Sequence, residues 1–200
     1  MKFTKQLLQQ MLSSAMSSIL DNVDMLNRLD AATGDGDHGT AILTAMKAAA
    51  SSSQKDGNLA QVLDAIGWDV MSSASGSTST LTGSFFIGMA HSVKSDELDL
   101  SETIAMFESG LANVKVSTKA TIGDKTLMDA LIPAIEAISN SKDSSDSFTN
   151  TFQLAYEAAQ KGADSTKELL AKFGRAKNIG ERSRGNLDAG AVSTAIIYKT

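Results

Sequence analysis

Apolar residues recur at intervals of three and four along almost the whole chain, and this spacing limits the fold more than any other feature. From Leu8 to Leu26 it places one apolar stripe on a single helical face, so we predict a first helix over about residues 4–28. Only 5% of the residues are aromatic and one is proline, while 42% are hydrophobic. This composition favours helices packed through Ala, Leu, Ile and Met. The sequence therefore predicts an all-α protein.

Seven further helices follow from the same spacing. Their apolar stripes are Ile42–Ala49, Leu59–Val70, Leu81–Val93, Ile104–Val114, Leu127–Ile138, Phe152 to about Lys172, and a short last one from near Asp188. We expect Asn58 to cap the third helix, and Asp99 with Glu102 to form a capping box on the fifth. Pro133 removes a backbone hydrogen bond from the sixth helix, so we expect a kink there. No repeat of solenoid period and no linker between two cores occurs, so the expected architecture is a single domain over residues 1–200, a barrel or bundle of about eight antiparallel helices.

Charge and cysteine content exclude several classes of function. The 200 residues carry 18 Lys and Arg against 23 Asp and Glu, a net charge of −5, which argues against a nucleic-acid-binding protein. With no Cys, disulfides, thiolate zinc sites and cysteine nucleophiles are excluded. The amino terminus lacks the uninterrupted apolar core of a signal peptide or membrane span. We therefore expect a soluble, cytoplasmic protein whose partners are neither nucleic acids nor membranes.

Three carboxylates and an imidazole crowd the glycine-rich sequence DAATGDGDHG between the first two predicted helices. Asp35 and Asp37 are two residues apart, so in an extended backbone their side chains project to the same side. Asp30 must fold back to join them, and the glycines permit that turn. Like charges this close raise one another's pKa unless a cation compensates, so a divalent metal is the natural partner.

The sequence DAATGDGDHG has two other possible structures, a calcium loop and a solvated acidic turn. A calcium loop starting at Asp35 is excluded, because its sixth and twelfth positions would be Thr40 and Met46 where Gly and Glu are required. Oxygen ligands from a few carboxylates fit Mg²⁺, which keeps waters and completes its coordination with phosphates. A solvated acidic turn, in which Asp37 caps the second helix, remains an equal alternative on this segment alone.

Three other joins between predicted helices carry notable polar segments, and two of these are suited to phosphate. SSASGSTSTLTG at 72–83 offers hydroxyls and the free amides of a helix start, although it contains no P-loop motif and a flexible polar connector is the alternative. The segment 174–190 is locally basic, and arginine forks suit phosphate oxygens; a solvated basic loop is the alternative. GDKTLMD at 123–129 begins the sixth helix, where an ordinary capped helix start explains it equally well.

Taken together, these segments resemble one known family. GDGDHGT at 34–40, the Ser/Gly/Thr run before GSFF at 83–86, GDKTLMDALIPAIE at 123–136 and GRAKNIGERSRGNLDAGA at 174–191 are similar to the nucleotide-binding L subunit of phosphotransferase-system dihydroxyacetone kinases. The same domain also occurs in ATP-dependent dihydroxyacetone kinases. The four motifs follow the family's order over nearly the whole chain. The resemblance implies an all-α barrel of eight antiparallel helices with ADP held at one end.

The resemblance also implies roles for individual residues. Two Mg²⁺ ions would be bound by Asp30, Asp35 and Asp37. The nucleotide as a whole would contact His38, Gly39 and Thr40, its phosphates Ser77 and Thr78, and its adenine Leu127. The carboxyl-terminal segment would close the site through Arg175, Asp188 and Gly190. Arg175 is the expected catalytic residue, because an arginine can stabilise charge on the migrating phosphoryl group, and no protein nucleophile is required.

The implied activity is phosphotransfer within a larger assembly. In the family, ADP is a cofactor that is not exchanged: a phosphohistidine subunit, called M, phosphorylates it in place. The resulting ATP passes its γ-phosphoryl group to dihydroxyacetone, which a separate K subunit holds covalently. Three matters remain open: an ATP-dependent triose or ketose kinase subunit, a non-catalytic nucleotide-binding regulatory partner, and assembly as a homodimer.

Several positions depart from the family pattern. Where members usually have GGASGP, this chain has SGSTST at 75–80, and Ala41 replaces the Asn that often follows His-Gly. Ala189 replaces the usual Pro, and Lys177 with Asn178 replaces Ser-Tyr. The expected metal ligands are kept while phosphate and ribose contacts change. We therefore expect nucleotide affinity or ketose specificity to differ from those of a typical member.

Overall fold

The computed structural model describes residues 1–74, 76–141 and 147–199. Within these ranges the helices are α1 (Lys5–Ala31), α2 (His38–Ser52), α3 (Leu59–Ser73), α4 (Ser77–Ser92), α5 (Leu100–Ser117), α6 (Met128–Asn140), α7 (Phe148–Ser165) and α8 (Ala189–Tyr198). Two 3₁₀ helices, η2 (Thr166–Glu168) and η3 (Arg175–Ser183), lie between α7 and α8. The short strands β1 (Phe3–Thr4) and β2 (Glu97–Leu98) complete the described elements.

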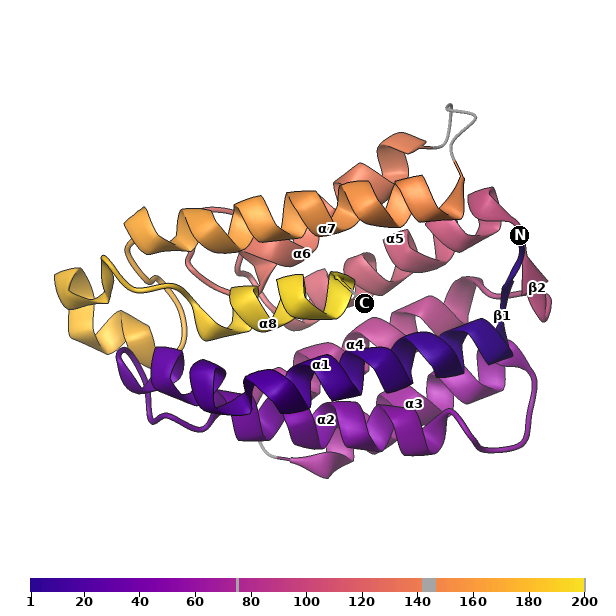
Figure 1. The fold of residues 1–200 in the computed structure, drawn as a ribbon, viewed down its shortest axis with the longest axis horizontal. Helices are drawn as coiled ribbons and strands as arrows, with labels where there is room; N and C mark the ends of the chain where they lie inside the picture. Colours follow the sequence, from indigo (N-terminus) through magenta and orange to yellow (C-terminus); the bar gives the residue numbers. More distant parts are fainter. Residues whose placement is uncertain (75, 142–146, 200) are drawn as a thin grey trace.

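The eight α-helices form a closed barrel. Each helix packs against its neighbours in the sequence, and α8 packs against α1, which closes the ring (Figure 1). The helices run along the long axis of the molecule, as an up-and-down arrangement with short connections requires (Figure 1). The prediction of an all-α fold of about eight antiparallel helices is therefore confirmed.

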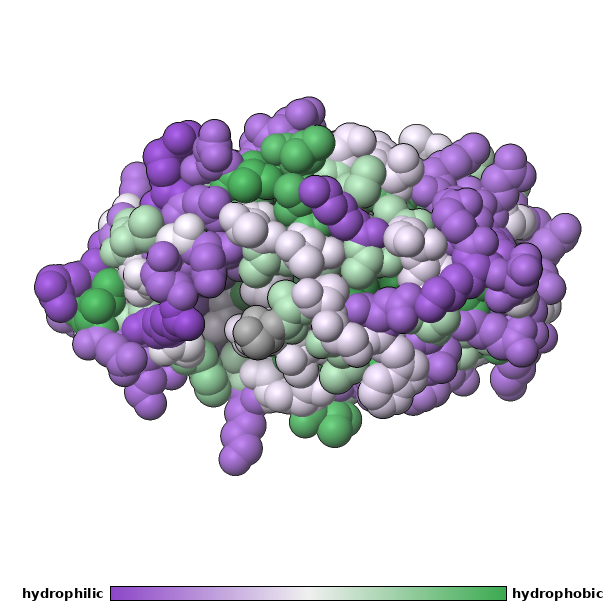
Figure 2. All heavy atoms as spheres, turned by 90° about the horizontal axis from the view of Figure 1, so that it is seen from below, coloured by the Kyte–Doolittle hydropathy of each residue, from purple (hydrophilic) through white to green (hydrophobic). Residues whose placement is uncertain are grey.

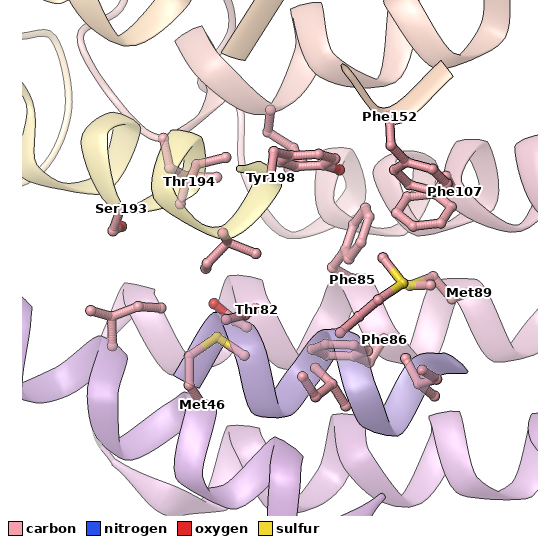
Figure 3. A pocket seen from close by; sticks show the side chains of 18 of the residues that line it. Met46, Thr82, Phe85, Phe86, Met89, Phe107, Phe152, Ser193, Thr194 and Tyr198 are labelled. Atoms are coloured by element: carbon pink, nitrogen blue, oxygen red, sulfur yellow. The ribbon is translucent and has the colours of Figure 1, made fainter. Parts of the chain in front are cut away.

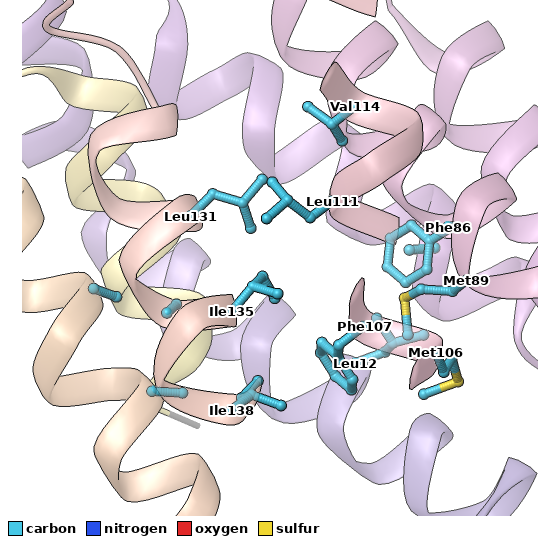
Figure 4. Packing of buried hydrophobic residues seen from close by; sticks show 14 of the residues in the cluster. Leu12, Phe86, Met89, Met106, Phe107, Leu111, Val114, Leu131, Ile135 and Ile138 are labelled. Atoms are coloured by element: carbon cyan, nitrogen blue, oxygen red, sulfur yellow. The ribbon is translucent and has the colours of Figure 1, made fainter. Parts of the chain in front are cut away.

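The apolar stripes that predicted the helices face the interior of this barrel. The inward face of α3 is completely buried along its length, through Leu59, Val62, Leu63, Ile66 and Val70. In Figure 4, Leu111 of α5 and Leu131 of α6 point toward each other across a helix pair, and both are buried. Hydrophilic side chains gather toward the two ends of the face seen in Figure 2. None of the helices in the described part of the chain is long and apolar enough to cross a membrane.

The predicted cap of Asn58 on α3 and the predicted capping box on α5 are both confirmed. Asn58 and Gln61 exchange side-chain and backbone hydrogen bonds at the start of α3, and Asp99 and Glu102 do the same at the start of α5. The Thr4 side chain caps α1 by accepting from the Leu7 amide at 3.2 Å. These local bonds satisfy donors that a helix start otherwise leaves free.

Three details differ from the expected elements. The seventh helix was expected to reach about Lys172, but α7 ends at Ser165, where the chain passes into the 3₁₀ helix η2. The Thr166 carbonyl there accepts from the Leu169 amide and from the Lys125 ammonium. The first helix continues beyond the expected residue 28 to Ala31. A two-stranded antiparallel ladder, in which Phe3 pairs with Leu98, was not anticipated at all. The kink expected at Pro133 stays a prediction, although α6 runs through that residue without a break.

The barrel encloses an apolar cavity of about 420 Å³. Aromatic and methionine side chains crowd one part of it, among them Phe85, Phe86 and Met89 of α4 (Figure 3). The other part is bordered by residues from the joins between helices, namely His38, Thr78, Leu127 and Gly190. The cavity therefore extends to the end of the barrel where the sequence motifs lie.

Candidate functional site

The four motif-bearing joins meet at one end of the barrel. His38, at the start of α2, lies 3.3 Å from Thr78 Oγ1 of α4 and 2.9 Å from Ser193 Oγ of α8. Arg175 of η3 forms an ion pair with Asp35 in the α1–α2 join. Lys125, between α5 and α6, donates to main-chain carbonyls on either side of η3. An up-and-down barrel brings every second join to the same end, so the topology itself assembles these segments.

The carboxylates of Asp30, Asp35 and Asp37 form a compact group, which we name the acidic cluster. One oxygen of each lies within 4.8 Å of the others. Asp30 is partly buried and the other two are exposed. Asp30 Oδ2 accepts from the amides of Gly36 at 2.8 Å and Asp37 at 3.1 Å, and Gly36 adopts a φ of 80° that favours glycine. Asp30 thus folds back toward the other two residues, as the sequence indicated.

The acidic cluster fits a hard divalent cation such as Mg²⁺. Its donors are carboxylate oxygens, and two of the three side chains remain exposed, which leaves room for water and phosphate ligands. Asp37 occupies the position before α2, but its side chain makes no capping hydrogen bond. The structure therefore does not show the alternative in which Asp37 is simply a helix cap.

Arg175 reaches the acidic cluster from the far end of the sequence. Its guanidinium pairs with Asp35, and the arginine side chain remains 67% exposed. Gly174, just before it, has a φ of 63°, which favours glycine and begins the turn into η3. This ion pair joins the carboxyl-terminal segment to the acidic cluster, so at Arg175 the segment differs from a freely solvated basic loop. Whether the segment closes over a bound nucleotide stays a prediction.

Two helix starts beside the acidic cluster carry no side-chain cap. α2 follows Asp37 and α4 follows Gly76, and neither preceding residue makes a side-chain capping hydrogen bond. The starts adjoin, because Thr78 lies within hydrogen-bonding distance of His38. Uncapped first-turn amides and the positive end of the helix dipole favour an anion. Ser77 and Thr78 form the first turn of α4, and their contact with phosphate stays a prediction. Residue 75 of this motif lies outside the described residues.

His38 and Gly39 have packing roles besides any contact with a nucleotide. The two ring nitrogens of His38 lie near Thr78 and Ser193, so the imidazole bridges three helices. Burial lowers the pKa of His38, against the opposing effect of the Asp30 carboxylate. A Cβ at Gly39 would collide with the Val23 carbonyl of α1, so glycine is needed for α2 to pack there. Whether these two residues also contact a nucleotide stays a prediction.

Leu127 and Gly190 lie together at the mouth of the cavity. A Cβ on Gly190 would stand 3.3 Å from Leu127 Cβ, so a larger residue would narrow the space beside Leu127. Asp188 caps α8 by accepting from the Ala191 amide at 2.8 Å. Burial raises the pKa of Asp188 to about 7. Ala189 occupies the first position of α8, where the proline of the family pattern is also well tolerated, so this substitution leaves the helix start intact.

Two residues at this end were missed by reasoning from the sequence. Asn27, in the last turn of α1, accepts from the Thr40 amide at 3.1 Å and donates to the Thr40 hydroxyl at 3.2 Å. Ser193 lies one turn into α8 and borders His38. In the sequence, each was marked only by its closeness to a predicted site residue. Asn27 lies three residues before Asp30, and Ser193 lies three residues after Gly190. The Thr40 hydroxyl already accepts a hydrogen bond from Asn27 of α1. A nucleotide that contacts Thr40, as predicted, would therefore share this hydroxyl with Asn27.

Comparisons with known proteins agree with this arrangement. A family model described as DAK2 domain matches residues 32–200. The chain is 34% identical over 176 residues to the PEP-dependent dihydroxyacetone kinase 2, ADP-binding subunit DhaL, of Listeria innocua, covering 86% of this chain and 81% of the relative. It is 32% identical over 194 residues to the L-erythrulose kinase of Pectobacterium atrosepticum, covering 93% of this chain but 32% of that protein.

A solved structure has the same fold. The dihydroxyacetone kinase of C. freundii in complex with AMP-PNP and Mg²⁺ superposes with a TM-score of 0.74 at 26% identity. The match covers 100% of this chain and 34% of that one. The match thus covers about four fifths of the ADP-binding subunit of Listeria innocua, but about a third of the longer kinases.

Proposed function

The chain belongs to the DAK2 domain family, and on this premise we propose that it is an ADP- and Mg²⁺-carrying phosphotransfer subunit of a PEP-dependent dihydroxyacetone kinase. The observation that carries the proposal is the convergence of Asp30, Asp35 and Asp37 with Arg175 beside two uncapped helix starts. The length match with a relative named as an ADP-binding subunit supports a separate subunit. We propose that residues 1–200 act as a single nucleotide-binding domain.

In this proposal each part of the site binds one part of the ligand. The acidic cluster would hold two Mg²⁺ ions, which when bound neutralise charge on the phosphate oxygens. The first-turn amides of α2 and α4, with the hydroxyls of Ser77 and Thr78, would bind the phosphates. Leu127 and Gly190 would border the adenine, and Asp188 would hold the start of α8 beside it.

The chain's own contribution to the reaction is positioning and electrostatics. Phosphoryl transfer needs alignment of donor and acceptor and stabilisation of developing charge more than it needs a protein nucleophile. Arg175 would stabilise the migrating group, and its ion pair with Asp35 in the acidic cluster supports this role. The side chains of Asp35, Asp37 and Arg175 are exposed, so a partner protein can approach the reacting phosphate.

The partners follow from this open site. We propose that a phosphohistidine M subunit of the phosphotransferase system delivers the phosphoryl group, and that a K subunit presents dihydroxyacetone to receive it. We further propose that the protein acts in the cytoplasm, where such a relay operates. Homodimer formation is a separate proposal, which native mass spectrometry tests directly. The family departures at Ala41, Ser77–Thr80 and Ala189 lead us to propose an altered nucleotide affinity.

A second candidate is an ATP-dependent ketose kinase activity that uses free ATP. The match to an L-erythrulose kinase favours it, although this chain covers only 32% of that relative. The two candidates differ in their phosphoryl donor. With a cognate K subunit and dihydroxyacetone, turnover that requires phosphoenolpyruvate and its relay proteins supports the first candidate, and turnover sustained by ATP alone supports the second.

One experiment separates both candidates from a non-catalytic regulatory partner. The purified protein is heated, and the supernatant is chromatographed for adenine nucleotide; the phosphotransfer subunit should release ADP. Turnover with the K subunit is then compared for the wild type and Asp35→Ala. Turnover that is present in the wild type and lost in the variant supports catalysis, whereas a wild type that binds nucleotide without turnover with any K subunit tested supports regulation.

A further inference from the structure

Lys125 is a buried charge that the proposed phosphotransfer does not use. The residue is only 2% exposed, and it lies in the join between α5 and α6. Its φ is 60°, and it is the one non-glycine residue with a positive φ in the described part of the chain. Such a conformation persists for a lysine only where surrounding contacts impose it. The contacts of its ammonium therefore indicate what this residue is for.

The Lys125 ammonium joins the two ends of one segment. Its Nζ donates to the Thr166 carbonyl and, at 2.5 Å, to the Asn186 carbonyl. These carbonyls belong to the first and last residues of the segment 166–186, which we name the arginine loop because it carries Arg175. One buried side chain thus holds together the two ends of the loop that reaches the acidic cluster.

Other hydrogen bonds close the same base. The Gly185 amide donates to the Lys167 carbonyl at 2.8 Å, so the loop ends also pair directly. Lys172, inside the loop, donates through its side chain to Asp124 Oδ1 at 2.7 Å and through its amide to the Asp124 carbonyl at 3.2 Å. The residues around Lys125 therefore form a platform on which the arginine loop rests.

The charges around Lys125 explain why an ammonium is tolerated there. Burial lowers the pKa of Lys125, whereas the carboxylates of Asp188, Asp129 and Glu168 raise it. Asp129 is itself fixed, because its oxygens accept from the Gly123 amide at 2.6 Å and the Thr126 amide at 2.7 Å. Asp129 therefore fixes the turn that precedes α6, whose cap position, Leu127, makes no side-chain capping hydrogen bond. The Lys125 ammonium makes the longer-range contacts.

We propose that Lys125 is a positioning residue that holds the base of the arginine loop closed and thereby keeps Arg175 at the acidic cluster. Its effect on turnover rests on the proposed phosphotransfer function, but its effect on the loop does not. A lysine suits the task because its compact ammonium carries three donors, enough for two carbonyls and a neighbouring carboxylate.

The first test measures the loop itself. Lys125→Met is compared with the wild type and with Lys119→Met, an exposed lysine in the same join, by limited trypsin digestion without nucleotide or metal. We expect cleavage within the arginine loop to be roughly tenfold faster in Lys125→Met and unchanged in Lys119→Met, because proteolysis follows the population of the opened loop. An unchanged cleavage rate in a folded Lys125→Met, as judged by circular dichroism, would overturn the proposal.

The second test asks whether Lys125 acts through Arg175. Lys125→Met should lower kcat by about tenfold in the wild-type background, because small misplacements of a reacting group are costly. It should lower kcat by less than about twofold in an Arg175→Ala background, because no arginine remains to be positioned. Equal reductions in both backgrounds would mean a general structural role and would overturn the proposal.

A second variant keeps the proposal testable if Lys125→Met does not fold. Lys125→Gln retains two N–H donors, so it should retain part of the protection from trypsin and part of the turnover. A folded glutamine variant that retains neither the protection from trypsin nor the turnover of the wild type would contradict a hydrogen-bonding clamp. If the wild type shows no phosphotransfer, the proposed function fails while the trypsin comparison still decides the role of Lys125.

Discussion

The acidic cluster and the lysine clamp contain the same kinds of charged groups at the same end of the barrel. By the lysine clamp we mean Lys125 with Asp129 and Asp188. They differ in solvent exposure and in the partners that their charged groups have. In the acidic cluster, two of the three carboxylates are exposed and their only cation in the described structure, Arg175, comes from a loop. In the lysine clamp, Lys125 and Asp129 are buried and both are bound by main-chain groups.

The difference teaches how a ligand site is distinguished from a structural one. Buried charges are stable only when paired and hydrogen-bonded, so a buried ammonium that is bound by carbonyls and flanked by carboxylates indicates support for the fold. Exposed carboxylates that converge with an excess of negative charge indicate an external cation. The predictions below follow from this contrast.

The largest expected effect is that of Asp35→Ala on nucleotide binding. Removing one carboxylate of the acidic cluster should weaken Mg²⁺-dependent ADP binding by about a thousandfold, near 4 kcal/mol, because a divalent cation loses a ligand. Titration calorimetry measures this change. The free energy of unfolding without metal should fall by less than about 0.5 kcal/mol. Asp64→Ala, an exposed aspartate on α3, is the matched control, and a cooperative loss of folding in Asp35→Ala would show that the acidic cluster is structural.

The next effect is that of Asp129→Ala on stability. This change leaves the amides of Gly123 and Thr126 without their acceptor, and it removes a carboxylate beside buried Lys125. The free energy of unfolding should therefore fall by about 3 kcal/mol. Urea denaturation of the metal-free protein measures it. If the free energy of unfolding falls by less than about 0.5 kcal/mol, the lysine clamp stabilises the fold no more than the acidic cluster does, and the contrast between them is wrong.

Arg175→Ala should affect turnover more than binding. We expect kcat with the K subunit and relay proteins to fall by about a hundredfold, because the arginine stabilises charge that develops during transfer. The dissociation constant of ADP should change by much less. If the affinity for ADP falls as far as kcat does, Arg175 is a binding group rather than a catalytic one.

Removal of the metal should lower the melting temperature by a few degrees. With ADP and Mg²⁺ at about ten times their apparent dissociation constant, binding to the native state adds about 1.4 kcal/mol, which is roughly 3–6 °C for a chain of this size. Chelation should abolish this increment in the wild type. In Asp35→Ala, the melting temperature should be the same with and without chelator, and a chelator effect that persists in this variant would place the metal elsewhere.

The smallest expected effect is a pH dependence that comes from Asp188. Its pKa is raised to about 7 in the native state, so native protein retains a proton that unfolded protein releases near pH 4. The stability from this group is fully present below about pH 4 and is lost as the pH rises through about 7. Asp188 is partly exposed, so we expect the loss to stay below about 1.4 kcal/mol. Asp188→Asn should flatten the metal-free stability profile between pH 4 and 7, and an equally steep profile would assign the titration to another group.

The helices were predictable from sequence because burial on one face imposes a period. The end of α7 was not, because the chain passes there into the 3₁₀ helix η2, whose Thr166 carbonyl is bound by Lys125 from 41 residues away. Apolar spacing carries no information on which main-chain carbonyl a distant ammonium binds.

The site was predictable to a similar extent. The convergence of Asp35 and Asp37 follows from their spacing, and the approach of Arg175 agrees with the resemblance to a known family. The pairing of Asn27 with Thr40 depends on how α1 packs on α2, which no local pattern encodes. The segment GDKTLMD is typical of an ordinary helix start, where a lysine is usually exposed. The sequence alone does not show that Lys125 is buried and binds two distant carbonyls.

Native mass spectrometry of the purified protein tests the central claim most directly. The account predicts a mass equal to the polypeptide plus one adenosine diphosphate and magnesium, and the mass of the bare polypeptide for Asp35→Ala. A wild type that stays at the bare polypeptide mass even after incubation with ADP and Mg²⁺ would contradict the assignment of the acidic cluster as a nucleotide and metal site.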